Sequence, residues 1–479
     1  IYAEGSVGSV FLGDDEVVRQ VYFALRDRNW NTVPGVISDE DVRITSEGFL
    51  VTFSSTHQAG SIRFSWKGTL QGEGNGRLTF TLDGTALNSF LRNRVGFCVL
   101  HPMEVAGKPC TVTHPDGTTE TASFPDLISP HQPFRQIRKL SYPVSPRTAV
   151  TIQLEGEVFE MEDQRNWTDA SFKTYSTPLD LPFPVEQPAG SVVHQTILIT
   201  PSEGAGLPAR RRREQAVSIT LARQERFRLP QMGFLWRAPF PNAPDILLDR
   251  LRRLRPDYLR FDMHPGLHDP GEMAEPLAAA VRLGAPLELA AFLGADEETE
   301  MTAIVRAVKQ TGAALRRVLV FKEGKKSTPS PSLWTARKTL DSAGLSVALC
   351  AGTDAFFAEL NRERPDMSAA DGVTFSINPQ VHVFDNESMV QSLAAQAVTI
   401  RTALSFSSGK PVHVSPVTFR MRWNPNATEP EQSAGPPDPR QLSLFGAAWT
   451  AGSIHSLASA GADSVTYFET FGGRGLMEG

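Results

Sequence analysis

The sequence is poor in cysteine and has no long apolar runs. Its 479 residues include only three cysteines, Cys98, Cys110 and Cys350. An odd, low count without a C-x-x-C pair excludes a disulfide framework and a zinc knuckle. Cys98 and Cys110 are close enough in sequence to pair, but we expect buried free thiols and therefore a reducing, cytoplasmic compartment. No uninterrupted run of about 18 apolar residues occurs, so no membrane span is predicted.

An excess of positive charge is also lacking. The formal net charge is −6 and the isoelectric point is near 6.0, which argues against a nucleic-acid partner. The one basic cluster, Arg210 to Arg213, follows a Gly/Pro stretch and is interpreted as a solvated linker. Hydrophobic residues make up 41% and charged residues 21%, so a chain of this length predicts two or three globular domains.

Several catalytic motifs are missing. The sequence has no G-x-S-x-G nucleophile elbow, no H-E-x-x-H and no P-loop, which argues against an α/β-hydrolase, a zincin and a P-loop enzyme. No G-x-G-x-x-G follows the first strand of the second half, so a dinucleotide-binding domain is not favoured. We expect neither a cofactor nor a metal ion.

Residues 1–225 show the period-two alternation that is typical of half-buried antiparallel strands. Short β-branched and aromatic runs, such as those at 42–45, 48–53, 61–66 and 77–82, are separated by turn residues. Asp83-Gly and Asp116-Gly are interpreted as hairpin turns. Many short strands at this spacing predict an N-terminal β-sandwich.

Residues 226–479 alternate between apolar strands and helices, which predicts a parallel sheet. Eight strands in roughly 250 residues match a catalytic (β/α)₈ TIM barrel better than a doubly wound sheet. The expected strands are 232–236, 258–263, 287–293, 317–321, 346–350, 373–377, 411–414 and 464–468. Helices are expected at 246–254, 272–283, 300–311, 333–343 and 389–403, and a functional loop at 423–439.

The candidate site residues follow from the barrel. Functional side chains of a TIM barrel emerge at the carboxyl ends of its strands. Read in this way, the sequence gives four candidate catalytic residues, Glu469, Asp262, His264 and Lys322, and four candidate substrate-binding residues, Glu323, Asn378, His382 and His413. Glu469 is the strongest candidate, because a carboxylate at the end of an apolar strand costs free energy unless it is paired or used.

One segment outside the barrel is dense in charged and aromatic residues. Residues 160–175 include Asp163, Arg165, Asn166 and Trp167, a mixture that suits recognition of a hydroxylated ligand. We therefore expect these four residues to bind substrate and part of the segment to contact the barrel or its mouth.

Three stretches carry a resemblance to a known family. The segment 160–175, Asn378-Pro-Gln-Val-His382 and the closing stretch 467–475 (YFETFGGRG) resemble the D-apionate lactonases, over nearly the whole chain. The resemblance implies a bacterial enzyme of apiose catabolism that hydrolyses D-apionolactone to D-apionate. It also implies a sandwich-like domain, a barrel and a small C-terminal domain, which we expect to be missing or truncated here. No catalytic residue is carried over.

The leading hypothesis is a lactonase that acts on a small-molecule sugar lactone, not on nucleic acid or membranes; the oligomeric state stays open. Glu469 or Asp262 would activate water, and Lys322, His264 or His382 would stabilise the oxyanion. The alternatives are a glycoside hydrolase that pairs Glu469 with Asp262 or Glu323, and a non-catalytic carbohydrate-binding protein. A metal-dependent lactonase using Asp262, His264 and His382 is a further variant.

Overall fold

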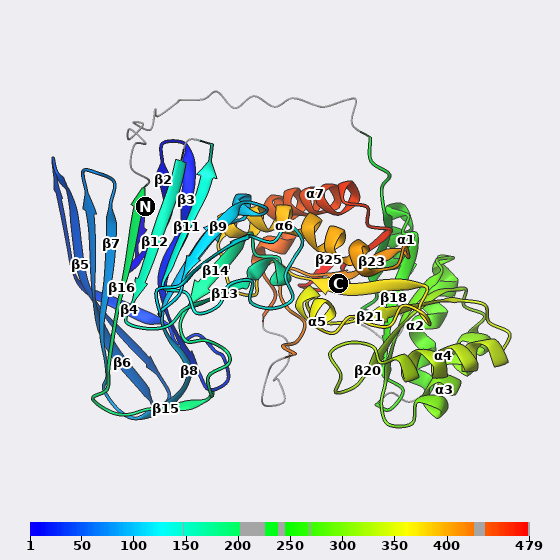
Figure 1. The fold of residues 1–479 in the computed structure, drawn as a ribbon. Coiled ribbons are helices and arrows are strands. Elements are labelled where there is room, and N and C mark those ends of the chain that lie inside the picture. Colours follow the sequence, from blue (N-terminus) through cyan, green and yellow to red (C-terminus); the bar gives the residue numbers. More distant parts are fainter. Residues whose placement is uncertain (147, 202–225, 238–244, 268–269, 426–435, 478–479) are drawn as a thin grey trace. The chain divides into compact units, whose positions relative to one another are not determined.

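The computed structural model describes residues 1–146, 148–201, 226–237, 245–267, 270–425 and 436–477 (Figure 1). They form two compact units. The first contains Ile1–Gln164 and the described residues from Ser171 to 201, and the second contains Arg165–Ala170 and the described residues from 226 onwards. The expected domain boundary at 225 lies outside the described residues, and so do Arg210 to Arg213.

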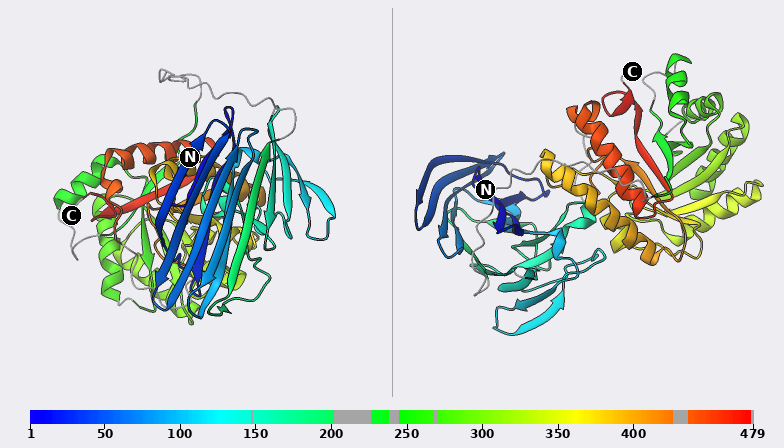
Figure 2. Two further views of the ribbon diagram at one scale, coloured as in Figure 1. Left: turned by 90° about the vertical axis from the view of Figure 1, so that its left-hand side faces the viewer. Right: turned by 90° about the horizontal axis from the view of Figure 1, so that it is seen from above.

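The first unit contains two antiparallel sheets (Figure 2). The larger has the order β10 (Thr119–Ser123), β9 (Pro109–Thr113), β11 (Lys139–Ser145), β12 (Thr148–Glu155), β16 (Val192–Pro201), β7 (Leu78–Ala86), β6 (Ile62–Glu73), β5 (Gly48–Ala59) and β4 (Gly35–Thr45). The smaller has the order β1 (Tyr2–Ala3), β2 (Ser6–Leu12), β3 (Asp15–Asp27), β8 (Phe90–Pro102), β14 (Ser171–Tyr175) and β13 (Glu160–Asp163), with β15 (Val185–Gln187) paired to β8.

The predicted alternation produces the core between these sheets. Every second residue of β6 is buried, among them Phe64, Trp66 and Leu70. The Trp66 ring lies 6.2 Å from that of Phe97, which β8 contributes from the other sheet. Side chains from both sheets thus form one apolar cluster, and the β-sandwich prediction is confirmed.

Of the two predicted hairpin turns, one is confirmed and the other is wrong. Asp116-Gly117 does join β9 to β10, and Gly117 has a φ of +85°, which favours glycine. Asp83-Gly84 is not a turn, because both residues lie inside β7. A glycine is needed at position 84 because a Cβ there would lie 2.5 Å from the Phe64 ring and clash with it.

The second unit is a closed parallel barrel surrounded by helices (Figure 1). Its strands are β17 (Gln231–Leu235), β18 (Tyr258–Met263), β19 (Leu287–Leu293), β20 (Leu315–Lys322), β21 (Ala348–Gly352), β22 (Gly372–Ile377), β23 (Val412–Val417) and β24 (Ser464–Phe471). Pairing of β17 with β24 closes the barrel. The TIM barrel prediction is confirmed, and the strand ends differ from the expected ones by a few residues. A short strand, β25 (Gly475–Met477), pairs with β24.

The helices are α1 (Asp245–Leu254), α2 (Pro270–Leu283), α3 (Glu297–Thr311), α4 (Ser330–Ser342), α5 (Phe357–Arg362), α6 (Asn386–Phe406) and α7 (Leu444–Ser459). Two of these helices, α5 and α7, were not predicted. The first has only six residues, and α7 contains no charged side chain that would mark a polar face. Of the loop expected at 423–439, residues 426–435 lie outside the described part.

The barrel interior is unusually polar. Arg260, Glu288 and Arg317 come from neighbouring strands, and all three are buried. Arg317 Nε lies 3.0 Å from Glu288 Oε2, and Arg260 Nη1 lies 3.2 Å from the Ser415 hydroxyl, which in turn donates to Glu288. Buried charges are tolerated only when they are paired. The interior is therefore held together by ion pairs as well as by apolar packing.

Two further predictions are tested by the fold. All three cysteines are buried free thiols, as expected. None of the helices in the described ranges is long and apolar enough to cross a membrane.

Candidate active site

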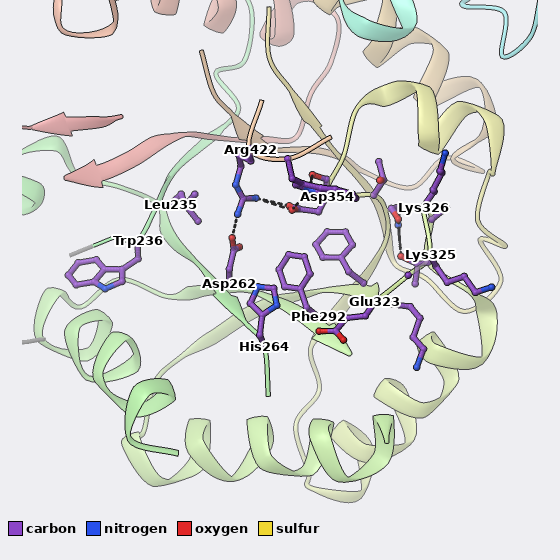
Figure 3. A pocket seen from close by; sticks show the side chains of 18 of the residues that line it. Leu235, Trp236, Asp262, His264, Phe292, Glu323, Lys325, Lys326, Asp354 and Arg422 are labelled. Carbon is purple, nitrogen blue, oxygen red and sulfur yellow. Dashed lines mark hydrogen bonds and ion pairs between the residues drawn. The ribbon is translucent and has the colours of Figure 1, made fainter. Parts of the chain in front are cut away.

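A cavity of about 780 Å³ opens at the carboxyl ends of the barrel strands (Figure 3). Strand ends contribute Leu235, Asp262, Phe321, Gly352 and Glu469. Lys322 at the end of β20 and the loops that follow the strands add polar groups, namely Arg237, His264, Glu323, Lys325, Lys326, Asp354, Arg422 and Arg474. This is where catalytic residues of TIM barrels lie, so the cavity is the candidate active site.

Four charged side chains form a clamp at the cavity wall. Arg260 Nε lies 2.8 Å from Asp262 Oδ1, and its Nη2 lies 2.5 Å from Asp354 Oδ1. Arg422 bridges the same two carboxylates, with Nη1 2.8 Å from Asp354 Oδ1 and Nη2 bonded to Asp262 Oδ2 (Figure 3). The Trp423 indole donates to Asp354 Oδ2 at 3.3 Å. Each aspartate is therefore held by two guanidinium groups.

This clamp determines the protonation state of Asp262. Burial by itself would raise the pKa of its carboxyl group, but the charges of Arg260 and Arg422 outweigh burial and lower the pKa to about 2. The two aspartates in turn outweigh the effect of burial on Arg422 and raise its pKa. A carboxylate with so low a pKa is a weak base at neutral pH.

A β-bulge turns Glu469 towards the cavity. In β24, Thr466 faces the barrel interior, where it donates to Glu288 at 3.1 Å, whereas Tyr467 donates outward to Ser453 of α7 at 2.8 Å. Unbroken alternation would place residue 468 inside and Glu469 outside. Instead, Phe234 of β17 lies opposite Tyr467 and Leu235 lies opposite Glu469, so Phe468 is the extra residue.

The backbone at the bulge is unusual. Phe468 has a φ of +46°, in the left-handed region that bulky residues rarely adopt. Its ring packs against Phe419 at a centroid distance of 5.3 Å, which secures the conformation. As a result, Glu469 lines the cavity as expected and is only 9% exposed. Its Oε1 lies 3.4 Å from Nη1 of the largely exposed Arg237.

Three other predicted residues line the same cavity. The His264 ring stacks on Phe292 at 4.2 Å with only 9° between the planes. The Lys322 ammonium group is already paired, since it lies 2.8 Å from Glu297 Oε1 and bonds the Gly294 carbonyl. Glu323 is exposed at the rim. Of these, His264 has the fixed orientation that a catalytic hydrogen-bond donor needs.

Part of the segment 160–175 packs on the barrel, as expected. Residues 165–170 belong to the barrel unit. The Asp169 carboxylate lies 2.6 Å from His382 Nδ1, and the Thr168 hydroxyl donates to the Asn378 carbonyl at 2.9 Å. The Trp167 ring meets the His382 ring edge-on at 5.3 Å. These contacts attach the segment to the carboxyl end of β22.

Five residues of this region that were predicted to bind substrate lie outside the cavity lining. Asn378 and His382 are not in the cavity lining, and neither are Arg165, Asn166 and Trp167. Arg165 is fully buried, Asn166 accepts a hydrogen bond from Asn361 at 3.1 Å, and the Arg362 guanidinium lies 5.0 Å from the Trp167 ring. The structure therefore does not bring these side chains to the candidate active site, and their substrate-binding role stays a prediction.

Two more predicted ligands also lie elsewhere. His413 is buried inside the barrel, 2.8 Å from the Ser464 hydroxyl and bonded to Arg317. Burial and the neighbouring Arg317 hold its pKa well below the usual value. Asp163 belongs to the sandwich unit, where it accepts the Ser129 N–H at 3.0 Å. Neither lines the cavity, so the structure does not bring them to the candidate active site, and their substrate-binding role stays a prediction.

Three members of the clamp were not predicted from the sequence. Arg260 stands two residues before Asp262 in β18, so period two already places both side chains on one face. Asp354 was missed because β21 runs to Gly352, beyond its expected end at 350. Arg422 is far away in the sequence, immediately before the loop that was expected to be functional. Of these three residues, only Arg260 could have been identified from the sequence, through its two-residue spacing from Asp262.

The metal-dependent variant has no support in this geometry. Asp262 and His264 line the cavity, but His382 is bonded to Asp169 outside it. Within the described ranges, no group of three or more His, Cys, Asp and Glu side chains is arranged to hold a metal ion.

Comparison with solved structures gives only distant similarity. A β-arabinopyranosidase is 10% identical with a TM-score of 0.28, over 95% of this chain and 85% of that one. An endo-β-1,4-mannanase from Thermotoga petrophila is 13% identical with a TM-score of 0.33, over 53% of this chain and 70% of that one. Values this low say nothing about the activity of this chain.

Comparison with known sequences is decisive. The family model described as the D-apionate lactonase N-terminal domain matches residues 1–204, and the D-apionate lactonase TIM barrel domain matches residues 240–479. A protein named D-apionate lactonase from Brucella anthropi is 32% identical over 498 residues, which cover 99% of this chain and 81% of that protein. These matches support the lactonase hypothesis over a glycoside hydrolase or a non-catalytic binding protein. With two domain families and a near full-length relative in agreement, this chain belongs to the D-apionate lactonase family.

Proposed function

We propose that this enzyme hydrolyses a sugar-acid lactone, D-apionolactone, to D-apionate in the cytoplasm. The family membership supports the reaction class. The single structural observation that carries the proposal is the carboxylate of Glu469, turned by a bulge towards a polar cavity at the catalytic end of the barrel. A buried carboxylate in such a cavity suits proton transfer.

In the proposed mechanism, Glu469 removes a proton from a water molecule as the water oxygen attacks the lactone carbonyl carbon. The carbonyl oxygen becomes the oxyanion of a tetrahedral intermediate. When the bond between the acyl carbon and the ring oxygen breaks, protonated Glu469 returns the proton to that oxygen. The products are a hydroxyl group and a carboxylic acid, which ionises at neutral pH.

The oxyanion needs a hydrogen-bond donor at a fixed place. We assign this role to His264, whose ring is held by stacking on Phe292. Lys322 contributes indirectly, because its contacts with Glu297 and the Gly294 carbonyl tie the end of β20 to the loop after β19. Asp262, an alternative base in the sequence analysis, is excluded from that role in our proposal by its low pKa.

The test is lactone turnover by the purified protein. D-apionolactone opening is followed by acid release at constant pH and corrected for spontaneous hydrolysis, with a p-nitrophenyl glycoside series as the comparison. We expect catalysed opening of the lactone and no release of nitrophenol. Release of nitrophenol without lactone opening would support the glycoside hydrolase alternative and refute the proposal.

A further inference from the structure

Asp262 combines a fixed orientation with unused hydrogen-bonding capacity. Its Oδ1 accepts from Arg260 Nε at 2.8 Å, and its Oδ2 accepts from Arg422 Nη2. An ionised carboxylate has about four acceptor positions, two on each oxygen. The described residues therefore occupy one position per oxygen, which leaves one on each for a ligand in the cavity.

Asp354 differs from Asp262 in this respect. Its Oδ1 accepts from both Arg260 and Arg422, and its Oδ2 accepts from Arg422 at 3.1 Å and from Trp423 at 3.3 Å. All four acceptor positions are thereby used. Asp354 anchors the two guanidinium groups. Asp262, which Figure 3 shows bonded to Arg422, lines the cavity and has one acceptor position on each oxygen that the described residues do not use.

We propose that Asp262 is a specificity-determining residue that binds a vicinal diol of the lactone, one hydroxyl to each carboxylate oxygen. This inference rests on the proposed function and deepens it. Two neighbouring hydroxyls present two O–H donors, which match two acceptor positions on one planar group. Hydrogen bonds from hydroxyls to an ionised carboxylate are short and roughly twice as strong as neutral ones.

Other carboxylates of the cavity suit this role less well. Glu323 is exposed at the rim, where water competes for its oxygens. The Asp262 side chain is only 16% exposed, and two guanidinium groups hold its plane, so little orientational freedom is lost when a ligand binds. A pre-oriented carboxylate makes the enzyme selective for hydroxylated lactones over plain ones.

The experiment compares 2,3-dihydroxy-γ-butyrolactone with unsubstituted γ-butyrolactone in the wild type and in Asp262→Asn. We expect kcat/KM for the diol lactone to fall at least about tenfold, mainly through KM, since two charge-assisted hydrogen bonds are weakened. The value for the unsubstituted lactone should change less than about threefold, because that substrate makes no such contact. The ratio of the two values is the readout.

Two further variants separate recognition from folding. Asp371→Asn removes another ion-paired aspartate, one that bonds Arg337 just before the amino end of β22, and should leave the ratio unchanged. Asp262→Glu keeps the charge but displaces the carboxylate, so it should lower the ratio with the fold retained in a thermal melt. If Asp262→Asn fails to fold, the ratio of the two kcat/KM values in Asp262→Glu tests the inference instead.

Two results would overturn the inference. One is an unchanged ratio in a folded Asp262 variant. The other is a hundredfold fall in kcat for both lactones, which would make Asp262 part of the chemical step. Competitive inhibition by cis-tetrahydrofuran-3,4-diol, which has no carbonyl, gives a readout independent of the reaction. If the wild type binds this diol and Asp262→Asn does not, the inference is supported even if no lactone is hydrolysed. Failure of the inference and failure of the proposed lactonase function therefore give different results.

Discussion

Replacement of Glu469 by glutamine is the most direct perturbation of the proposed mechanism. The amide keeps the shape of the side chain but cannot accept the proton of the attacking water. Loss of a general base costs about 10²–10⁴ in rate. We therefore expect kcat/KM for D-apionolactone to fall by at least about 10²-fold, with the fall in kcat rather than in KM, because the base acts in the transition state.

The fold should tolerate this change. The Glu469 carboxylate lies 3.4 Å from Arg237, whose side chain is 66% exposed. Ion pairs with so exposed a partner contribute about 0–1 kcal/mol. The bulge itself depends on the backbone and on the packing of Phe468 against Phe419, which the substitution leaves intact. A thermal melt should therefore shift by no more than about 3 °C.

The assay is the initial rate of lactone opening, corrected for spontaneous hydrolysis at each pH. Glu298→Gln is the matched control, because this glutamate lies on α3, is 68% exposed and pairs only with Lys338 among the described residues. It should retain full activity. A folded Glu469→Gln enzyme with activity within a few-fold of the wild type would remove Glu469 from the mechanism and refute the argument built on the bulge.

Three further predictions concern stability. Burial lowers the pKa of His101 to about 3. Below about pH 6.5 this histidine is protonated only in the unfolded chain, so the sandwich should lose about 1.4 kcal/mol of stability per pH unit down to about pH 3. In urea titrations at pH 6 and pH 5, His101→Gln should remove this contribution to the pH dependence, and an unchanged slope would contradict the prediction. Arg260→Leu should cost about 3–5 kcal/mol in denaturant unfolding of the barrel, because it removes one of the two cations that hold the buried carboxylates of Asp262 and Asp354. Trp449→Ala should cost about 3–5 kcal/mol in the same measurement, since the 2% exposed indole fills the core beside α6 and donates to the Met389 carbonyl; a loss below 1 kcal/mol would show that the site collapses around the cavity.

The fold could be predicted from the sequence because its signals are local. Period two in strands such as β6 and the alternation of strands with helices in the second half each reflect the burial of one face of an element. The exceptions have local causes too. Asp83-Gly84 has the composition of a turn, but the space beside the Phe64 ring requires a glycine within a strand.

The site could be predicted only in part. Glu469 and Asp262 were found from their places at strand ends, yet their surroundings come from distant parts of the chain. Arg422 reaches Asp262 across 160 residues, and it changes that carboxylate from a candidate base into a fixed acceptor. The bulge at Phe468 depends on the register with β17, which no local pattern in β24 reveals. His382 also follows a strand end, but its partner Asp169 comes from a distant part of the chain, and the histidine lies outside the cavity lining.

The polar interior of the barrel has a consequence for strand alignment. Arg260, Glu288 and Arg317 face inward from three adjacent strands, and each lies within reach of an opposite charge. A shift of β18 by one residue would turn Arg260 towards the helices, away from Asp354 and the Ser415 hydroxyl, and leave its charge unpaired. Unpaired buried charges cost several kcal/mol each, whereas a misaligned strand of leucines and valines would lose far less. We therefore expect the ionic interior to favour one strand register, and so one shear of the barrel, over registers shifted by one residue.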